Sequence, residues 1–512
     1  PEVDTYATAG HRTAALDVET TRMLLGEAPA AFNAGIQDIL LIAYALALTE
    51  FQDLEGITAD TTAAPVGIDV EGHGRQEELV DLPDVDLSRT VGWFTTKYPV
   101  AVNVGGPHGR LRWSQVVAGE SALGPVIKDA KEQLRALPDG LNYGLLRYLN
   151  PDVDLPGSGP AIGFNYLGRM GAAAAAESSA DLWLVSQDGM SVTAATAAIP
   201  MPLEHTVELT ASTVDTDAGP HLHASWTWAP SALDDTQISR LSQLWFDALT
   251  GICTHVSQHG GGLTPSDILP ARLTQQEIDE LSRQHRIADV LPLTPLQQGL
   301  LFHSNATSGN DDDVYAMQLD ITVTGPLDPD RLREAVHTVV NRHPNLAARF
   351  SQRFDEPVQI IPADPSVPWQ YLVMDTEGKG ADDSVIDEQI ERLCAAERAA
   401  VCDLAHESSF RTALIRTGDG EHRFILTNHH IVLDGWSLPI LLQEVFASYY
   451  QQRLPAAGSY RRFVTWLVDR DIDAAHTAWR EVLAGFNTPT LVAPSGRSPG
   501  RRGTESFRLP AE

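Results

Sequence analysis

Glycine and proline divide this sequence into many short segments, and this punctuation limits the folds that the chain can adopt. Thirty-nine glycines and 32 prolines are spread over 512 residues without a repeat of fixed short period. Such spacing favours an α/β chain over a coiled coil or a solenoid, which both need long regular segments. Because 43% of the residues are hydrophobic, the chain can still bury a large core. We therefore expect an α/β fold of several parts.

Charge, cysteine content and hydropathy exclude several classes of protein. A formal net charge of -32 opposes binding to a phosphate backbone, so no nucleic-acid partner is expected. Cys253, Cys394 and Cys402 lack Cys-x-x-Cys spacing, which argues against a disulfide framework or a zinc site and favours the cytoplasm. The longest apolar run, Ile39 to Leu48, is too short to span a membrane. The opening Pro1 suggests a piece of a longer protein.

Composition and periodicity divide the chain into three parts. Residues 1–256 are expected to form one α/β block, residues 257–285 a linker rich in Gly, Pro and Asp, and residues 286–512 a second block. Helices are expected at 19–32, 36–51, 235–255, 274–284, 329–342, 385–400, 437–451 and 472–483. Strands are expected at 65–70, 95–102, 161–166, 221–227, 315–324 and 423–428.

One helix start in the second block has a specific signature. Thr294 is suited to the N-cap, Pro295 to the first helical position, and Gln297 to the return bond of a capping box. A helix is therefore predicted to begin at residue 295.

The strongest motif is His-His-Ile-Val-Leu-Asp-Gly, from His429 to Gly435, directly after an apolar strand. A strand that ends in two histidines and a turn can hold one imidazole at the mouth of a cleft, where it can exchange a proton near neutral pH. Two other interpretations stay open, a metal site and a purely structural pair. Adjacent side chains on a strand point to opposite faces, so these two histidines are poorly placed to share one ion.

Three further stretches occur in the order typical of one family. Leu291 to His303 (LPLTPLQQGLLFH), Asn341 to Leu346 (NRHPNL) and Tyr460 to Leu467 (YRRFVTWL) accompany the histidine motif. Together they resemble the condensation domains of nonribosomal peptide synthetases, which are related to chloramphenicol acetyltransferase. The resemblance implies the N-terminal lobe of such a domain, of the subtype that joins a D-donor to an L-acceptor.

The resemblance also implies roles for the motif residues. His430, beside His429, would position or deprotonate the acceptor amine that attacks a donor thioester. Asp434 would form a structural salt bridge, for which Arg342 is the expected partner. Gly435 would let the backbone pass close to a pantetheine arm.

The first block contains a second set of motifs around Glu71. Val70 to Arg75 (VEGHGR), taken alone, is typical of a solvated turn. Together with the stretches 89–100, 141–144 (LNYG) and 163–168 (GFNYLG), it resembles the C-terminal lobe of an epimerization domain. That resemblance implies that Glu71 is an acid/base at the Cα proton of a carrier-bound thioester. Asn165 and Tyr166 would stabilise the enolate-like charge.

Each resemblance covers one lobe, so each active site is expected to be represented by one wall. No second His-His-x-x-x-Asp-Gly motif occurs in residues 1–256, and the partner lobe of the condensation domain would begin near residues 505–512. The isolated chain is therefore expected to be nearly inactive. No adenylation or carrier motif is present. Substrates would arrive on the 4'-phosphopantetheine of peptidyl carrier domains, with adenylation domains and the complementary lobes as further partners. No directly bound cofactor or metal is expected.

Two other functions remain open at this point. The blocks could form a non-catalytic module that docks carrier proteins or tailoring enzymes. A free-standing acyltransferase that uses coenzyme A would have no need for the other block.

Overall fold

The computed structural model has an α/β fold, as expected, and divides into two compact units, residues 1–456 and 457–512. The described residues are 4–57, 64–75, 87, 90–106, 109–138, 140–153, 155, 159–170, 200–306, 314–374, 383–488 and 490. The three-part division of the chain remains a prediction, and residues 505–512 lie outside the described part.

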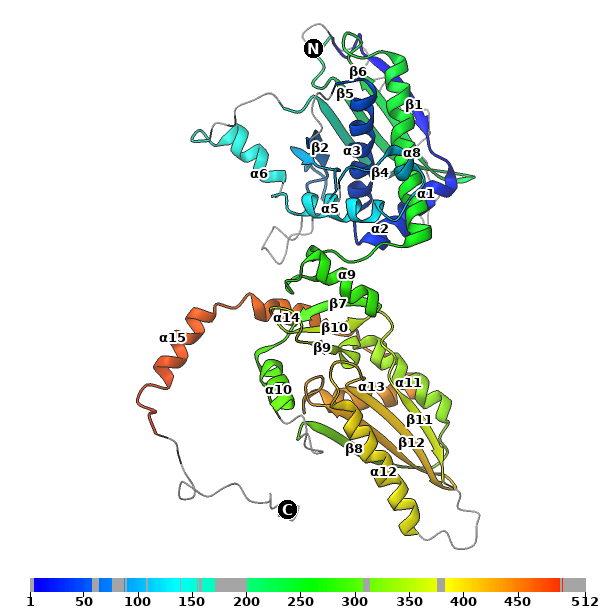
Figure 1. Cartoon of the computed structure of the whole chain (residues 1–512), viewed down its shortest axis with the longest axis vertical. Coiled ribbons are helices and arrows are strands. Elements are labelled where there is room, and N and C mark those ends of the chain that lie inside the picture. The colour runs from blue at the N-terminus through cyan, green and yellow to red at the C-terminus, as the bar shows by residue number, and fades with distance from the viewer. Residues whose placement is uncertain are drawn as a thin grey trace. The chain divides into compact units, whose positions relative to one another are not determined.

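A six-stranded mixed sheet lies in the first block of the larger unit (Figure 1). Its strands are β1 (Gly10–Ala15), β2 (Val66–Gly72), β3 (Thr96–Val102), β4 (Ile162–Met170), β5 (Val207–Thr216) and β6 (Gly219–Trp228). They follow the order β1-β6-β5-β4-β2-β3. The pairs β2·β4 and β4·β5 are parallel and the other pairs are antiparallel. Side chains alternate between the two faces of each strand, so each strand turns one face to the core.

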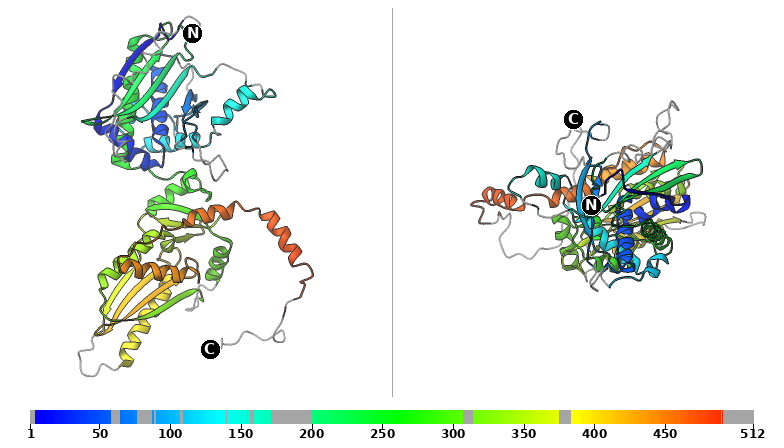
Figure 2. Two further views of the ribbon diagram at one scale, coloured as in Figure 1. Left: turned by 180° about the vertical axis from the view of Figure 1, so that it is seen from behind. Right: turned by 90° about the horizontal axis from the view of Figure 1, so that it is seen from above.

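Helices pack against the apolar face of this sheet, and Figure 2 shows the same part of the chain from behind. They are α1 (Val18–Leu25), α2 (Glu27–Phe32), α3 (Ile36–Leu54), α4 (Trp113–Val117), α5 (Leu123–Arg135) and α8 (Asp235–His259). The short α6 (Gly140–Gly144) and the π-helical η2 (Leu145–Leu149) follow α5 in the chain and project away from the sheet, and their residues are not part of its apolar core (Figure 1). The central helix is α3, in which every residue from Ile39 to Leu48 is buried. A helix that is apolar all round is stable only when it is enclosed by other elements.

No single described helix is long and apolar enough to cross a membrane. Residues 18–32 and 36–54 meet the length and composition required only when taken as a pair, and that pair is bent by 95°.

The helix predicted at 19–32 is in fact two helices, because the chain leaves helical geometry at Gly26 (φ -130°, ψ -76°). The strands β1 and β5 were not predicted. In contrast, the helices predicted at 36–51 and 235–255 are present as α3 and α8 with slightly later ends.

The segment predicted to be a linker is packed rather than loose. It contains the 3-10 turn η5 (Pro265–Ile268) and the predicted helix, which is α9 (Gln275–Gln284). Thr274 caps α9 and Glu277 completes a capping box. Buried side chains of the segment share one apolar cluster with strands of the second block: Ile268, Ala271, Leu273, Ile278, Leu281, Val290, Val358 and Ile360.

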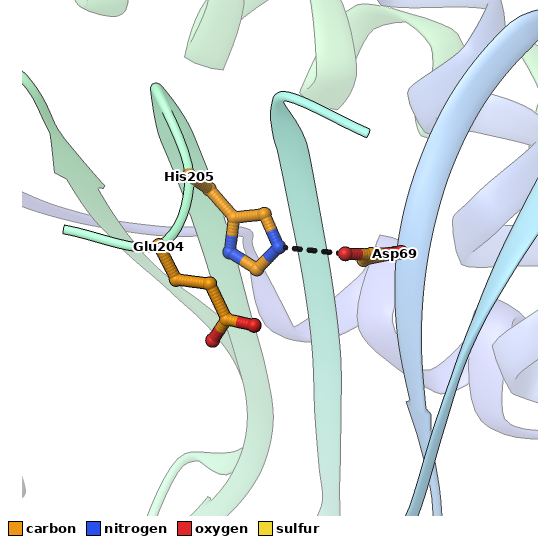
Figure 3. Close-up of side chains that lie close together, drawn as sticks. All are labelled: Asp69, Glu204 and His205. Atoms are coloured by element: carbon orange, nitrogen blue, oxygen red, sulfur yellow. Dashed lines mark hydrogen bonds and ion pairs between the residues drawn. The ribbon is translucent and has the colours of Figure 1, made fainter. Parts of the chain in front are cut away.

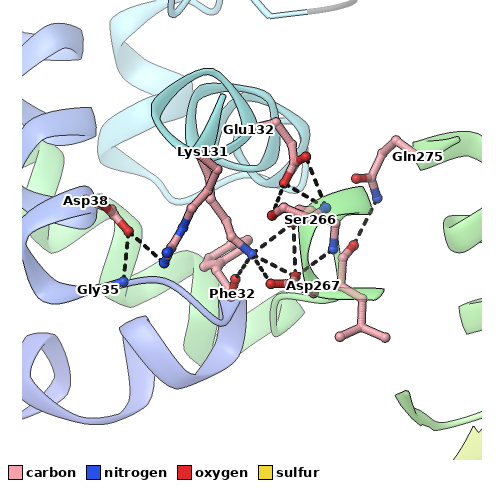
Figure 4. A network of polar contacts seen from close by, with 11 residues as sticks. Phe32, Gly35, Asp38, Lys131, Glu132, Ser266, Asp267 and Gln275 are labelled. Atoms are coloured by element: carbon pink, nitrogen blue, oxygen red, sulfur yellow. Dashed lines mark hydrogen bonds and ion pairs between the residues drawn. The ribbon is translucent and has the colours of Figure 1, made fainter. Parts of the chain in front are cut away.

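The same segment is tied to the first block by a buried charge (Figure 4). Lys131 of α5 has no exposed side-chain surface, and its Nζ lies 2.6 and 2.7 Å from the two carboxylate oxygens of Asp267. The ammonium also donates to Phe32 O at 2.7 Å and to Thr264 Oγ1 at 2.8 Å. A buried ammonium is tolerable only with such a complete set of acceptors.

The described residues of the second block form two sheets. The three-stranded sheet has the order β7-β10-β9 and the four-stranded sheet the order β11-β12-β13-β8. Their strands are β7 (Ile287–Pro292), β8 (Ala316–Thr324), β9 (Arg349–Ser351), β10 (Val358–Pro362), β11 (Trp369–Val373), β12 (Phe410–Gly418) and β13 (Glu421–His429). The helices that accompany these sheets are α10 (Pro295–Ala306), α11 (Pro329–Arg342), the 3-10 turn η6 (Pro344–Ala347), α12 (Asp383–Val401) and α13 (Ser437–Tyr449).

The smaller unit contains α14 (Tyr460–Val468) and α15 (Ile472–Val482). The prediction of a helix at 329–342 is confirmed to the residue, because Asp328 caps it and Pro344 follows it. The helix predicted to begin at residue 295 is α10, and the strands predicted at 315–324 and 423–428 are present as β8 and β13.

Candidate active sites

The first residue of the histidine motif ends strand β13 and is completely buried. His429 Nδ1 accepts the backbone N–H of Ile431 at 3.1 Å, so the ring proton must be on Nε2. Nε2 lies 3.0 Å from the hydroxyl oxygen of Ser304 on α10. Because both ring nitrogens of His429 are engaged, this residue could not bind a metal ion without losing those contacts. The sequence did not predict the role of Ser304.

The second residue of the motif, His430, is half-buried and follows the strand. Its Nδ1 lies 2.7 Å from the carbonyl oxygen of Leu433. A carbonyl oxygen only accepts, so Nδ1 carries a proton, and in the neutral ring the lone pair is then on Nε2. The fold therefore orients the ring and fixes the tautomer in which Nε2 is the proton-accepting atom.

A glutamine from α10 supports the loop of the motif. Thr294 and Gln297 exchange the two hydrogen bonds of the predicted capping box, at 2.9 and 3.3 Å. The amide of Gln297, which is buried, also donates to Ile431 O at 2.9 Å. One residue therefore caps the helix and fixes the turn that follows His429. The sequence predicted the first of these roles only.

The predicted salt bridge between Arg342 and Asp434 is wrong. Arg342 Nε instead donates to Glu444 Oε2 of α13 at 3.0 Å, and His343 Nε2 lies 3.0 Å from the same oxygen. Burial acts against the ionised form of Glu444, but the bonds from Arg342 and His343 outweigh it and lower the pKa of the carboxyl. The reason for the difference is position: Glu444 is buried between α11 and α13, whereas Asp434 is exposed.

Asp434 has a local role. Its Oδ1 accepts the backbone N–H of Ser437 at 2.8 Å, at the start of α13. Bonds from the side chain and the backbone of Ser437 lower the pKa of the Asp434 carboxyl. The adjacent Gly435 faces open space, since a Cβ built on it would meet nothing within 4 Å. Close approach of a pantetheine arm to this glycine stays a prediction.

In the first block, the three residues singled out in sequence line one cavity of about 530 Å³. Asn165 Nδ2 donates to Glu71 Oε2 at 2.7 Å. This contact follows from the register, in which Glu71 of β2 lies opposite Asn165 of β4. The hydroxyl of Tyr166 lies 3.1 Å from Thr213 Oγ1 on β5. The start of α3 also lines the cavity, and Gln37 Nε2 donates to the backbone oxygen of Glu71 at 3.4 Å.

Several groups act on the Glu71 carboxyl. Burial raises its pKa most, and the nearby carboxylates of Glu208 and Glu204 raise it further. The charges of Lys97 and His205 act in the opposite direction. The net effect is a raised pKa, which brings the carboxyl closer to the range in which it can both take up and release a proton.

Three side chains near this cavity have donor atoms of the types that bind metals. Ligand atoms of Asp69, Glu204 and His205 all lie within 4.8 Å of one another (Figure 3). Lys97 Nζ, however, lies 2.5 Å from Glu204 Oε1, so an ammonium already provides positive charge there. A metal ion would have to compete with that ammonium for the same carboxylate.

Most of the second block matches one known protein family. Residues 287–511 match the family described as Condensation domain. The matched stretch begins with β7 and includes both histidines of the motif. The matched stretch therefore begins close to the predicted start of the second block.

Curated relatives align with almost the entire chain and belong to large synthetases. One of the linear gramicidin synthase proteins of Brevibacillus parabrevis is 33% identical over 98% of this chain, which spans 6% of that protein. Bacitracin synthase 3 from Bacillus licheniformis is 30% identical over 96% of this chain, which spans 7% of it. The alignments thus cover the first block as well as residues 287–511, within proteins many times longer.

A solved structure is similar to about half of the chain. The epimerization domain from the third module of tyrocidine synthetase B is 24% identical, with a TM-score of 0.37, and the similarity covers 49% of each chain.

Proposed function

We propose that this chain is an internal part of a nonribosomal peptide synthetase. Its condensation domain would join a donor and an acceptor, and its first block would epimerize the donor beforehand. Both substrates would be thioesters on the 4'-phosphopantetheine of peptidyl carrier domains, and adenylation domains would load those carriers. The observation that carries this proposal is the fixed tautomer of His430 within a matched condensation domain.

In peptide-bond formation, the amine of the acceptor attacks the thioester carbonyl of the donor. A C–N bond forms, the C–S bond breaks, and the carrier thiol leaves with a proton. Nε2 of His430 would hold the attacking amine by accepting one of its hydrogens, and could take up the proton that the amine loses. His429 would act as a support, because its own nitrogens are bound to Ile431 and Ser304.

In epimerization, a proton leaves Cα of the aminoacyl or peptidyl thioester and returns from the other face. We propose that Glu71 handles the proton on one face, which its burial and raised pKa support. Asn165 holds the Glu71 carboxylate by a hydrogen bond of 2.7 Å and lines the same cavity. The proton on the other face would be handled by a group outside residues 1–256, so the isolated chain is expected to racemise thioesters very slowly.

The condensation proposal is tested by His430→Ala in the parent synthetase. Loss of the nitrogen that accepts from the amine should reduce peptide formation at least about 100-fold. His337→Ala is the matched control, because His337 lies exposed on α11. Unchanged product with His430→Ala would favour the rival function, a module that only docks carrier proteins or tailoring enzymes.

The epimerization proposal is tested by Glu71→Gln, with exchange of the Cα proton for deuterium as the readout. Glutamine keeps the size of the side chain but cannot act as a base, so exchange should fall at least about 100-fold. Glu19→Gln on α1 is the control, since Glu19 is exposed. Exchange at the normal rate with Glu71→Gln would reject the role of Glu71.

A further inference from the structure

The polar face of the six-stranded sheet arranges its side chains in rows that cross the strands. In one row, Asp69 of β2 lies opposite Gly163 of β4, which in turn lies opposite Glu208 of β5. In the next row, Glu71 lies opposite Asn165. Neighbouring rows on one face are about 6.6 Å apart, because they are separated by two residues of a strand.

The middle of the first row is filled by a residue from outside the strands. Gly163 has no side chain, and the ring of His205 lies over it: a Cβ built on Gly163 would be 2.6 Å from His205 Nδ1. Only 5% of the His205 side chain is exposed. His205 Nε2 lies 3.1 Å from Asp69 Oδ2, and Nδ1 lies 3.8 Å from Glu208 Oε2 (Figure 3 shows the contact with Asp69).

This position favours the charged ring. A neutral imidazole has one N–H and one lone pair, whereas an ionised carboxylate only accepts. Nε2 is within hydrogen-bond distance of Asp69, whereas Nδ1 has no hydrogen-bond partner among the described residues and meets Glu208 only at ion-pair distance. A neutral ring can therefore donate to Asp69 alone, whereas a protonated ring also attracts the Glu208 carboxylate. Burial by itself lowers the pKa of His205, but the contacts with Glu208 and Asp69 outweigh it and raise the pKa above its usual 6.5.

We infer that His205 is a buried imidazolium that serves as a positioning residue for the Glu71 site, with Asp69 and Glu208 as its two anchors. The inference rests on the proposed epimerization function of Glu71. The ring would hold the row of side chains beside Glu71 in register. Its positive charge would offset the surrounding carboxylates, so that Glu71 can ionise and accept the Cα proton.

The charged and titratable groups around the ring come from four segments. Asp69 and Glu71 belong to β2, Lys97 to β3, Glu208 to β5, and Glu204 precedes His205 in the chain. Tyr6 of the N-terminal segment lies close to the same carboxylates. Burial raises the pKa of Tyr6, and the charges of Glu208, Glu204 and Glu71 raise it further. Four carboxylates thus face two cations, Lys97 and the proposed imidazolium.

The sign of the effect on Glu71 follows from these charges. His205 and Lys97 lower the pKa of Glu71, and Glu208 and Glu204 raise it. Replacing the imidazolium by a neutral group should therefore raise the pKa of Glu71 further. An additional rise would reduce the ionised fraction of Glu71 at any given pH below its pKa.

The first test is an NMR titration of this chain with ¹³C-labelled glutamate carboxyls and labelled histidine rings. In the wild type, the His205 ring should be protonated at pH 6.5 and lose its proton only at higher pH. In His205→Gln, the titration of Glu71 should move upward by about half a pH unit or more. A His205 ring that is neutral at pH 6.5 in the wild type would overturn the inference, whether or not the variant folds. An unmoved Glu71 titration in a folded variant would also overturn it.

The second test is the pH profile of Cα deuterium exchange in the parent synthetase. His205→Gln should move the acidic limb of the profile to higher pH and recover most of the activity above that limb. A purely structural role would instead reduce exchange at every pH, and that result would contradict the inference. Failure of the proposed function is a separate result, in which Glu71→Gln keeps normal exchange while the NMR titrations still report on His205.

Discussion

His429 and His430 are neighbours in the sequence but carry their ring protons on opposite nitrogens. A backbone N–H that donates to Nδ1 fixes the proton of His429 on Nε2. A carbonyl oxygen that accepts from Nδ1 fixes the proton of His430 on that atom. In the turn after β13, the ring of His429 therefore has a structural role, and the Nε2 lone pair of His430 is the one that can accept a proton.

The two tautomers can be observed directly by ¹⁵N NMR of the histidine rings above pH 7.5. His430 should show a pyrrole-type shift at Nδ1 and a pyridine-type shift at Nε2, and His429 should show the reverse. Ser304→Ala should alter the Nε2 shift of His429 and leave that of His430 unchanged. The same tautomer in both rings would contradict the assignment.

The pairing of Arg342 with Glu444 predicts a specific pattern in double-mutant cycles. Arg342→Ala and Glu444→Ala should each destabilise the chain, and their coupling energy should be about 1–3 kcal/mol because both side chains are largely buried. Arg342→Ala and Asp434→Ala should be additive within about 0.5 kcal/mol. Denaturant midpoints measure both cycles. A larger coupling with Asp434 than with Glu444 would restore the pairing first expected from the sequence.

The buried ion pair of Lys131 and Asp267 should contribute strongly to holding the segment 257–285 against the first block. Lys131→Met leaves the largely buried Asp267 carboxylate without its ammonium, which should cost about 3–5 kcal/mol. The amides of residues 264–268 should then exchange with deuterium much faster. Lys128→Met is the matched control, because the partner of Lys128, Asp279, is 42% exposed and such a pair contributes at most about 1 kcal/mol. Equal effects of the two substitutions would argue against a special role for Lys131.

His205 predicts a pH dependence of stability. Its pKa is raised in the folded chain, so the folded state binds its proton more tightly than the unfolded state. The resulting stabilisation is complete below the ordinary value of 6.5 and is lost as the pH rises through the folded pKa. The stability difference between the wild type and His205→Gln should therefore be largest near pH 6 and shrink toward pH 9, measured by urea unfolding at each pH. A difference that grows with pH would have the wrong sign.

The sequence correctly predicted the elements whose formation depends on residues close to one another in the chain. The N-cap of α11 and the capping box of α10 are set by residues within four positions of one another, so the sequence was sufficient. The buried helix α3 was likewise clear from its unbroken apolar run. Strand β1 was missed because its partner among the described strands is β6, some 200 positions later, and because it has few apolar residues of its own.

The candidate sites divide in the same way. The residues proposed to carry the chemistry, His430 and Glu71, could be named from the sequence alone, because their motifs and the order of those motifs are local features. The contacts of the site residues were found only in the folded chain. His430 contacts Leu433 O, Glu71 contacts Asn165, Arg342 contacts Glu444, and His205 contacts Asp69 and Glu208. Most of these pairs join residues about 90 or more positions apart. Their contacts depend on strand register and helix packing, which arise only when the whole core has formed.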